Sequence, residues 1–87
     1  MKLILTVIGK DNTGIIAGVS SVCATQSANI LDIQQTIMDT TFVMIMLVEA
    51  LRDSLSVLRD ELLTLEKKLG VKINVYNEEV FHAMHRV

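Results

Sequence analysis

The chain has 87 residues, a formal net charge of −2, 51 % hydrophobic residues and 3 % aromatic residues. This length supports one domain and leaves no room for a second, and the charge and low aromatic content exclude a basic, base-stacking surface for nucleic acid. The single cysteine, Cys23, excludes an internal disulfide and a multi-cysteine metal framework.

The mean hydropathy of +0.46 is high for so small a soluble protein. The longest apolar run, residues 42–48, is too short to span a bilayer, so we predict no membrane segment. The surplus apolar surface is instead expected to be buried against another copy of the chain. The first residues lead directly into a strand-like pattern without a small-residue cleavage site, so we expect no signal peptide and a cytoplasmic location.

Residues 2–8 are largely apolar on both faces, which is typical of a central strand. A polar loop follows between Gly9 and Gly14, two residues that can adopt backbone angles forbidden to residues with a Cβ. The helix that starts after this loop presents backbone N–H groups and the positive end of its dipole, which suits a carboxylate or another small anion. The alternative is that the residues of this loop only turn the chain and cap the helix, without binding a ligand. Three favourable N-cap residues lie in the loop, and the pattern does not choose among them: Asp11, Asn12 and Thr13.

Residues 14–27 have the spacing of an amphipathic helix. The predicted buried stripe is Ile15, Ile16, Val19, Val22 and Cys23. Small residues make up the other side of the helix, and no charged residue occurs between Asn12 and Leu31. Such a face fits a subunit contact or an ordinary surface, and the two interpretations stay open.

Residues 30–38 alternate between apolar and polar and predict a strand with one buried and one solvated face. After a short turn at Asp39 and Thr40, residues 41–50 predict a second central strand, because residues 42–48 are apolar on both faces. The methionines of this strand, Met44 and Met46, favour core filling over a soft-metal site.

A second helix begins at residues 52–54 and ends at Gly70, with leucines recurring at steps of three and four. Its two heptads are too few for a coiled coil, so we expect it to pack on the sheet. The leucines are Leu55, Leu58, Leu62, Leu65 and Leu69.

Residues 71–76 alternate as in an edge strand, and Asn77 can cap a short final helix. His82 and His85 lie three residues apart on that helix. Because no acidic or cysteine ligand is evident beside them, a solvated pair is favoured over a zinc site.

The order strand, helix, strand, strand, helix, strand closes most simply as an α+β, ferredoxin-like βαββαβ sandwich formed by one domain, residues 1–87. Right-handed crossovers place the first and third strands in the middle of an antiparallel sheet with the order 4-1-3-2. The two strands that are apolar on both faces are then the two central ones. A short C-terminal helix completes the fold.

Familiar uses of this architecture need residues that are missing here. A metal chaperone needs two cysteines before the first helix, and an RNA-binding sheet needs aromatic and basic residues on its central strands. An acylphosphatase-like enzyme needs an arginine at its phosphate cradle, and the loop has only Lys10. No nucleophile and base are recognisably set up together, so we expect no enzyme, no cofactor and no metal.

Residues 9–20, Gly-Lys-Asp-Asn-Thr-Gly-Ile-Ile-Ala-Gly-Val-Ser, together with Asn-Ile-Leu-Asp at 29–32, resemble the ACT domain, and the likeness covers essentially the whole chain. Small stand-alone ACT proteins and the single domains of the glycine-cleavage regulator family share the Asp-x-x-Gly-Ile turn and the later Asn-Ile-x-Asp. The resemblance implies a regulatory domain that binds amino acids or related small molecules at a subunit interface and modulates a metabolic enzyme or regulator. We expect no attached domain within these 87 residues, which leaves the target open.

Asn29 and Asp11 lie at opposite ends of the first helix, roughly 20–25 Å apart at about 1.5 Å per residue, so the two cannot share a ligand within one chain. Antiparallel pairing of the second strand with that of another copy would bring them together in a two-fold homodimer, formed through the second strand and the first helix. We expect backbone N–H groups in this dimer to receive the carboxylate of an amino acid, while polar side chains of both copies receive its ammonium group. The predicted ligand-binding residues are Asp11, Asn12, Thr13, Gly14, Ile15, Asn29, Ile30 and Asp32.

Alternatives remain open for these residues. Asp11 has a second interpretation as a helix cap, and Asn29 as a left-handed turn residue. A second hypothesis for the whole chain is a ligand-independent interaction adaptor, which docks on a protein partner through its sheet edge or its small-residue helix face.

Overall fold

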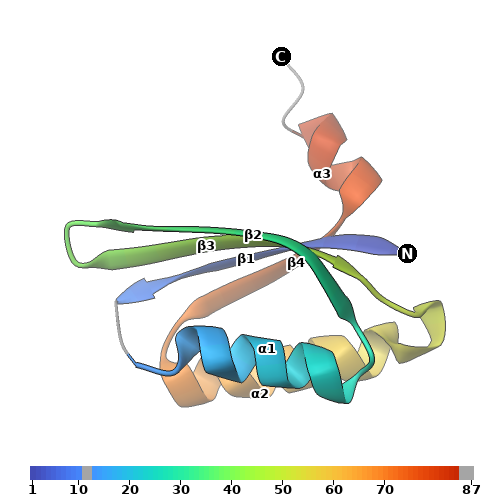
Figure 1. The fold of residues 1–87 in the computed structure, drawn as a ribbon, viewed down its shortest axis with the longest axis horizontal. Coiled ribbons are helices and arrows are strands. Elements are labelled where there is room, and N and C mark those ends of the chain that lie inside the picture. The colour runs from blue at the N-terminus through green and yellow to red at the C-terminus, as the bar shows by residue number, and fades with distance from the viewer. Residues whose placement is uncertain (11–12, 85–87) are drawn as a thin grey trace.

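The computed structural model describes residues 1–10 and 13–84, without the side chains of residues 81, 82 and 84. Four strands form one sheet, and two helices cover one of its faces (Figure 1). The elements in chain order are β1 (Lys2–Lys10), α1 (Ile15–Thr25), β2 (Asn29–Met38), β3 (Thr41–Glu49), the 3-10 turn η1 (Arg52–Ser54), α2 (Leu55–Leu69), β4 (Lys72–Asn77) and α3 (Glu78–Met84).

The sheet has the order β2-β3-β1-β4, and every neighbouring pair is antiparallel. This confirms the predicted ferredoxin-like topology, with β1 and β3 in the middle. Leu3 lies opposite Val48 on the face toward the helices, and Ile4 lies opposite Leu47 on the other face. The helix-facing residues of β1 and β3 are buried, whereas Ile8 and Ile45 on the other face are 45 % and 42 % exposed.

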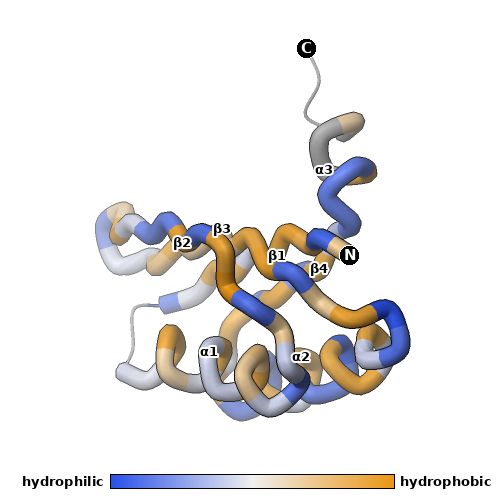
Figure 2. Tube along the Cα trace, turned by 45° about the vertical axis from the view of Figure 1, so that its right-hand side comes forward, coloured by the Kyte–Doolittle hydropathy of each residue, from blue (hydrophilic) through white to orange (hydrophobic). Residues whose placement is uncertain are grey.

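The hydrophobic core fills the layer between the sheet and helices α1 and α2. Cys23, Met44 and Met46 are fully buried in it, so the methionines fill the core, and burial raises the pKa of the Cys23 thiol. In Figure 2 the strands contain long hydrophobic stretches, in orange, whereas the residues before α2 and at the start of α3 are hydrophilic, in blue. The buried core residues are Leu3, Leu5, Val7, Ile15, Val19, Cys23, Ala28, Phe42, Met44, Met46, Val48, Ala50, Leu58, Leu62 and Val71.

Helix α1 ends at Thr25, two residues earlier than predicted. Ser27 follows with a left-handed φ of 56°, and the N–H of Ala28 donates to the carbonyl of Cys23 at 2.8 Å. These are the backbone features of a Schellman C-cap, which reverses the chain and delivers Asn29 as the first residue of β2. The alternative of Asn29 as the left-handed turn residue is therefore wrong, since Ser27 has that role.

Strand β2 differs from the prediction of one buried face. Apart from the half-buried Ile30, every residue of β2 is exposed. A register shift leaves Leu31 as an extra residue, because Ile30 pairs with Val48 and Asp32 pairs with Leu47. Beyond this bulge β2 is the outer strand of the sheet, and the tip of the β2–β3 hairpin extends past α1 (Figure 1). The helix layer covers Phe42, Met44 and Met46 of β3 but leaves the side chains of β2 exposed.

Helix α3 lies on the opposite side of the sheet from α1 and α2. It follows β4 directly and stands away from the sheet (Figure 1). We call this side of the sheet the open face.

Candidate functional site

The turn before α1 is built on Gly14, which is the N-cap residue with φ 95° and ψ −1°. Only glycine adopts this left-handed conformation without strain, and a Cβ placed there would meet no atom within 4 Å. Because glycine has no side chain, it cannot accept a hydrogen bond from the N–H groups of the first helical turn. Of the three candidate caps, Thr13 is not the N-cap residue, and Asp11 and Asn12 lie outside the described residues.

The surface at the start of α1 is formed by backbone rather than by side chains. Thr13 and Gly14 are exposed, whereas the side chain of Ile15 is 2 % exposed and lies in the core. No acidic residue occurs in the first turn of α1, so nothing in that turn opposes an anion. The chemistry available at Thr13, Gly14 and Ile15 is therefore that of backbone N–H donors at the positive end of a helix dipole.

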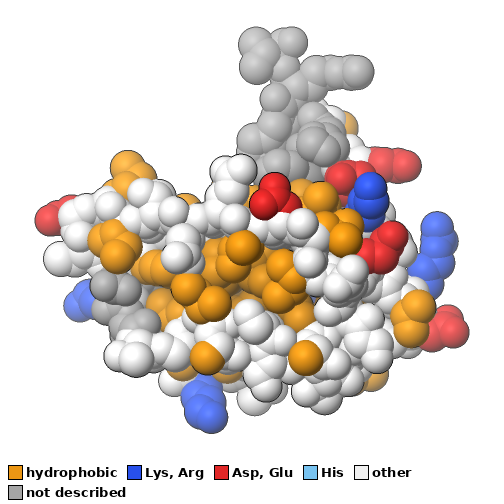
Figure 3. Space-filling view, in the orientation of Figure 1, with side chains coloured by type: hydrophobic (Ala, Val, Ile, Leu, Met, Phe, Trp, Pro, Cys, Tyr) orange, Lys and Arg blue, Asp and Glu red, His pale blue; other side chains and the backbone are white. Residues whose placement is uncertain are grey.

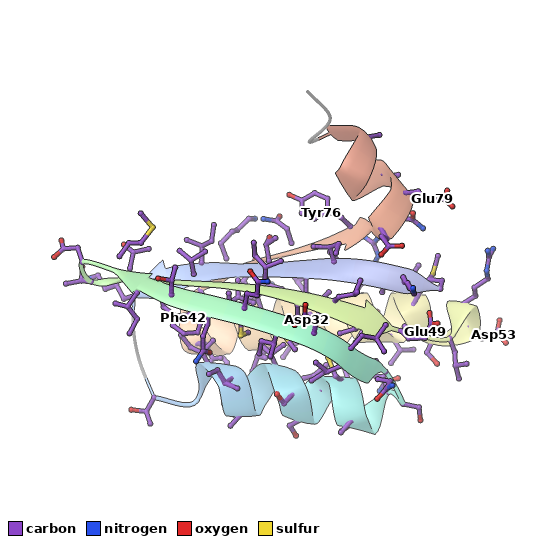
Figure 4. All side chains as sticks on the ribbon, turned by 45° about the horizontal axis from the view of Figure 1, so that its top comes forward. Asp32, Phe42, Glu49, Asp53, Tyr76 and Glu79 are labelled. Carbon is purple, nitrogen blue, oxygen red and sulfur yellow. The ribbon has the colours of Figure 1, made fainter. Side chains whose placement is uncertain are left out.

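The second half of the predicted site lies at the start of β2. Asn29 is exposed and pairs in register with Glu49, and Ile30 packs its half-buried side chain against the core. Asp32 lies opposite Leu47 on the open face, and its Oδ1 accepts the N–H of Ile33 at 2.8 Å (Figure 4). Asp32 thus lies on the opposite side of the sheet from α1.

One chain does not bring the two halves together. The Gly14 turn and Asn29 lie at opposite ends of α1 (Figure 1), whose 11 residues span about 16 Å at about 1.5 Å per residue. Asp11 lies outside the described residues, so the expected distance between Asp11 and Asn29 stays a prediction. A ligand that touches both halves requires a second copy of the chain.

Sequence reasoning assigned several exposed apolar residues to the core. Ile16 of α1 is 39 % exposed, and Leu31, Ile33 and Ile37 of β2 are 45 %, 40 % and 55 % exposed. Figure 3 shows hydrophobic side chains gathered between β2 and α1 on one side of the molecule. We call these four residues the β2–α1 patch. The signal for it was present in the high mean hydropathy of so short a chain.

The small residues of α1 divide into two groups. Gly18 faces α2, since a Cβ at this position would lie 3.1 Å from Cδ1 of Leu65. Gly18 therefore serves helix packing. Four other small residues of α1 are exposed and extend the uncharged surface next to the β2–α1 patch: Ala17, Ser21, Ala24 and Thr25.

Features of other site types are absent from the described part of the chain. No group of three or more His, Cys, Asp or Glu residues in this part could hold a metal ion, and the side chains of the His82 and His85 pair lie outside it. None of the helices within residues 1–10 and 13–84 is both long and apolar enough to cross a membrane. A groove of about 370 Å³ between α1 and α2 has three apolar lining residues, Val22, Val57 and Leu65, and four polar or charged ones, Asp60, Glu61, Thr64 and Lys68.

Comparison with known proteins identifies close relatives of similar length. A UPF0237 protein of Clostridium acetobutylicum is 52 % identical over 89 residues, covering 100 % of both chains. The solved structure of an ACT domain protein from Streptococcus pneumoniae matches with a TM-score of 0.82 and 42 % identity over 98 % of each chain. A protein assigned as a glycine cleavage system transcriptional repressor shares the fold, with a TM-score of 0.79 and 20 % identity over 85 % of this chain and 43 % of its own.

The family model of the ACT domain matches residues 1–76, which include all four strands up to Tyr76 and both helices of the core. This match agrees with the βαββαβ topology and with the Asp-x-x-Gly-Ile turn at the start of α1. The chain belongs to the ACT domain family of regulatory, ligand-binding domains.

Proposed function

We propose that this protein is an amino-acid sensor that works as a homodimer, binds its ligand where β2 and α1 of two copies meet, and modulates a metabolic enzyme or regulator. The observation that carries the proposal is the exposure of the edge strand β2. This edge strand is ten residues long, exposed on both faces and rich in apolar side chains. A long apolar edge strand presents unpaired N–H and C=O groups that can bond a strand of another chain. Proteins that leave such an edge uncovered risk aggregation.

Antiparallel pairing of β2 with its copy supports the proposed site. With full overlap of the ten residues, Asn29 of one copy faces Met38 of the other. Met38 pairs with Thr41, and Thr41 pairs with Lys10 at the end of β1 from which the chain proceeds to the Gly14 turn. Asn29 of the second copy therefore arrives at the end of the molecule that holds the Gly14 turn.

The β2–α1 patch gives this pairing a driving force. Each of its four side chains is still about half exposed, so removing it from water contributes on the order of 1 kcal/mol. The exposed small residues of α1 allow a second copy to approach closely. In a two-fold dimer each copy presents the same surface, so the patch and the small residues of α1 each contribute twice.

The proposed ligand is a zwitterion. Its carboxylate receives hydrogen bonds from backbone N–H groups at Thr13 to Ile15, at the positive end of α1. Its ammonium group is bound by Asp11 or Asn12 together with Asn29 of the second copy. Ile30 contributes through its backbone, because its side chain packs on the core. Asp32, the last member of the proposed set, would reach the ligand only around the strand edge from the open face.

The regulated partner belongs to cytoplasmic amino-acid metabolism in this proposal. The structural neighbour assigned as a glycine cleavage system transcriptional repressor supports this class of target, since the name places an ACT fold in a regulator of glycine breakdown. The family's regulatory role supports it further.

The experiment is a titration of the full chain with each of the twenty amino acids, followed by calorimetry and thermal unfolding. A ligand present at about 100 times its dissociation constant should raise the free energy of unfolding by about 2.7 kcal/mol. Asn29→Ala should abolish this shift, while Asn74→Ala, a matched control on β4, should leave it intact. No heat and no shift with any amino acid would reject the sensor.

A pull-down in the presence and absence of the binding amino acid then tests regulation. The sensor predicts a partner whose capture changes with the amino acid. Capture of the same partner at the same level under both conditions would favour the ligand-independent adaptor instead.

A further inference from the structure

Strand β2 carries one charged side chain among its ten residues, that of Asp32 (Figure 4). Oδ1 of Asp32 accepts the backbone N–H of Ile33 at 2.8 Å, and both residues are exposed. No lysine or arginine within residues 1–10 and 13–84 forms an ion pair with this carboxylate. In this part of the chain the carboxylate is therefore held by the N–H of the next residue alone.

The N–H of Ile33 points away from β3, toward the outer edge of the sheet. The turn at residues 39–40 has two residues, so Met38 and Thr41 on either side of it form the first hydrogen-bonded pair of the β2–β3 ladder. Bonded pairs recur at every second residue, which directs the backbone groups of the odd-numbered residues in 33–37 outward. Ile33 thus belongs to the row of backbone groups that a second strand would bond.

A β-bulge lies next to the bond between Asp32 and Ile33. Leu31 is its extra residue. Bulges and charged side chains are two of the means by which proteins limit the pairing of edge strands. Both occur in the first half of β2, whereas the outward backbone groups of Gln35 and Ile37 have no side-chain acceptor among the described residues. The protection of this edge is therefore partial and is concentrated at Asp32.

The carboxylate that caps the β4 edge is held more firmly than that of Asp32. Oε2 of Glu66 accepts the N–H of Ile73 at 2.7 Å, and the Glu66 side chain, on helix α2, is 16 % exposed. Asp32 is exposed and bonds its own neighbour in the chain, so rotation of one side chain releases the N–H of Ile33. The cap on β2 is therefore a removable one.

We propose that Asp32 is a gate on the pairing of β2 with its copy, because its carboxylate occupies the N–H of Ile33 that the second strand needs. The gate rests on the β2 dimer of the proposed function, whose regulation it describes. Pairing exchanges the carboxylate for a carbonyl of the second copy, and the carboxylate then loses its partner beside an apolar strand. A two-fold dimer requires this exchange in both copies. Asp32 thereby lowers the affinity of an edge that would otherwise pair more tightly.

The test compares the dimer dissociation constants of Asp32 variants by sedimentation equilibrium over a concentration series, without any amino acid. Asp32→Ala removes the acceptor, so the dimer should become at least about tenfold tighter. Asp60→Ala removes the same charge from an exposed position on α2, and this matched control should leave the dissociation constant unchanged. An unchanged constant in Asp32→Ala, or a variant that stays monomeric at every concentration, overturns the gate.

Asp32→Glu separates the cap from simple charge repulsion between the two copies. This variant keeps the negative charge, but its longer side chain places the carboxylate beyond the bond to the adjacent N–H. The gate predicts that Asp32→Glu dimerises more tightly than the unaltered chain, as Asp32→Ala does. A gain in Asp32→Ala without any gain in Asp32→Glu would indicate repulsion alone and overturn the gate.

A second substitution tests whether the gained association uses β2. Ile33→Lys added to Asp32→Ala should reverse the gain in affinity, because it places a charge in the middle of the paired strands. A tight dimer that survives this addition overturns the gate, since the association then uses another surface.

Nuclear magnetic resonance tests the capping bond itself at a dilution where the chains are monomeric. The amide proton of Ile33 should move upfield in both Asp32→Ala and Asp32→Glu, because each variant removes the carboxylate from it. The amide proton of Gln35, which also points outward, should not move. An Ile33 resonance that stays in place overturns the gate.

These measurements contain no amino acid, so failure of the sensor and failure of the gate are distinguishable. A tighter dimer for Asp32→Ala and Asp32→Glu supports the gate even when calorimetry rejects amino-acid binding. Amino-acid binding by a chain whose dimerisation is indifferent to Asp32 overturns the gate and leaves the sensor standing.

Discussion

The two edges of the sheet differ in how their backbone is protected. Along β4, Oε2 of Glu66 on α2 accepts the N–H of Ile73 at 2.7 Å and lies 4.0 Å from Nζ of Lys72. Strand β4 has only six residues, and α2 and α3 both contact it. Strand β2 has ten residues, all exposed except the half-buried Ile30.

This difference indicates which edge is available for assembly. Short strands and covering elements are the usual means of preventing edge-to-edge association, and β4 has both. Strand β2 combines an open edge with Leu31, Ile33 and Ile37, each at least 40 % exposed. The β4 edge is therefore covered by other elements, whereas the β2 edge is exposed, and β2 is the edge through which we propose that two copies pair.

The largest expected effect comes from a charge on the open edge. Ile33 lies near the middle of β2, so Ile33→Lys would place two lysines close to the two-fold axis and remove apolar burial from each copy. The dissociation constant of the β2-mediated dimer should rise about 100-fold, which corresponds to about 3 kcal/mol. Analytical ultracentrifugation over a concentration series measures this change. Asn74→Lys on β4 is the matched control, and an equal effect of both substitutions would refute the difference between the edges.

The next largest effect comes from removing the side chain that protects the β4 edge. Glu66→Ala removes the carboxylate that accepts the N–H of Ile73, and the Glu66 side chain is only 16 % exposed. A lost hydrogen bond to a charged group costs about 1.5–3 kcal/mol, so urea unfolding should show a loss of about 2 kcal/mol. Glu61→Ala on the same helix, whose carboxylate bonds the side chain of Gln26 rather than backbone, is the comparison. A loss no larger than that of Glu61→Ala would show that Glu66 does not protect this edge.

A third change acts where β1 approaches the segment before β4. A Cβ at Gly9 would lie 2.6 Å from Cγ1 and 3.2 Å from Cα of Val71, which is 6 % exposed. Gly9→Ala should therefore cost about 1–3 kcal/mol, because both side chain and backbone must shift. Thermal unfolding measures the loss. The double variant with Val71→Ala should recover part of it, and a neutral Gly9→Ala would disprove the close approach.

The smallest change stabilises the connection into β2. Ser27 has φ 56°, a left-handed conformation that costs a non-glycine residue about 1–2 kcal/mol. Ser27→Gly removes this strain. Glycine also gives the unfolded chain more conformational freedom, which offsets part of the gain, so a net stabilisation of about 0.5–1 kcal/mol is expected. Denaturant unfolding measures it. Ser56→Gly inside α2 should destabilise instead, and loss of stability in both variants would contradict the Schellman cap.

Most of the fold could be predicted from the sequence because the two central strands carry apolar residues on both faces. The leucine spacing of α2 and the glycine after it located that helix equally well, ending at Leu69 before Gly70. The errors lie where tertiary position decides burial. Ile16 has helical core spacing, yet it is 39 % exposed because it lies beside the edge of the sheet.

Strand β2 could not be assigned correctly from its alternation. The register shift at Leu31 depends on pairing with β3, and the exposure of β2 depends on its place at the edge of the sheet, outside the helix layer. Neither quantity appears in a local pattern. For the proposed site, the sequence predicted a glycine turn before α1 and a strand near Asn29, which the structure shows at opposite ends of α1. The sequence did not reveal that Asp32 lies on the open face. Ligand binding by these residues stays a prediction.

Amide hydrogen exchange on the two edges tests the central claim most directly. We predict that at high protein concentration those amides of residues 31–37 that point away from β3 become protected, and that dilution below the dissociation constant restores their fast exchange. The β4 amide of Ile73 should exchange equally at both concentrations. Equally fast exchange of the β2 amides at all concentrations, in a chain that still sediments as a dimer or larger assembly, would contradict pairing through β2.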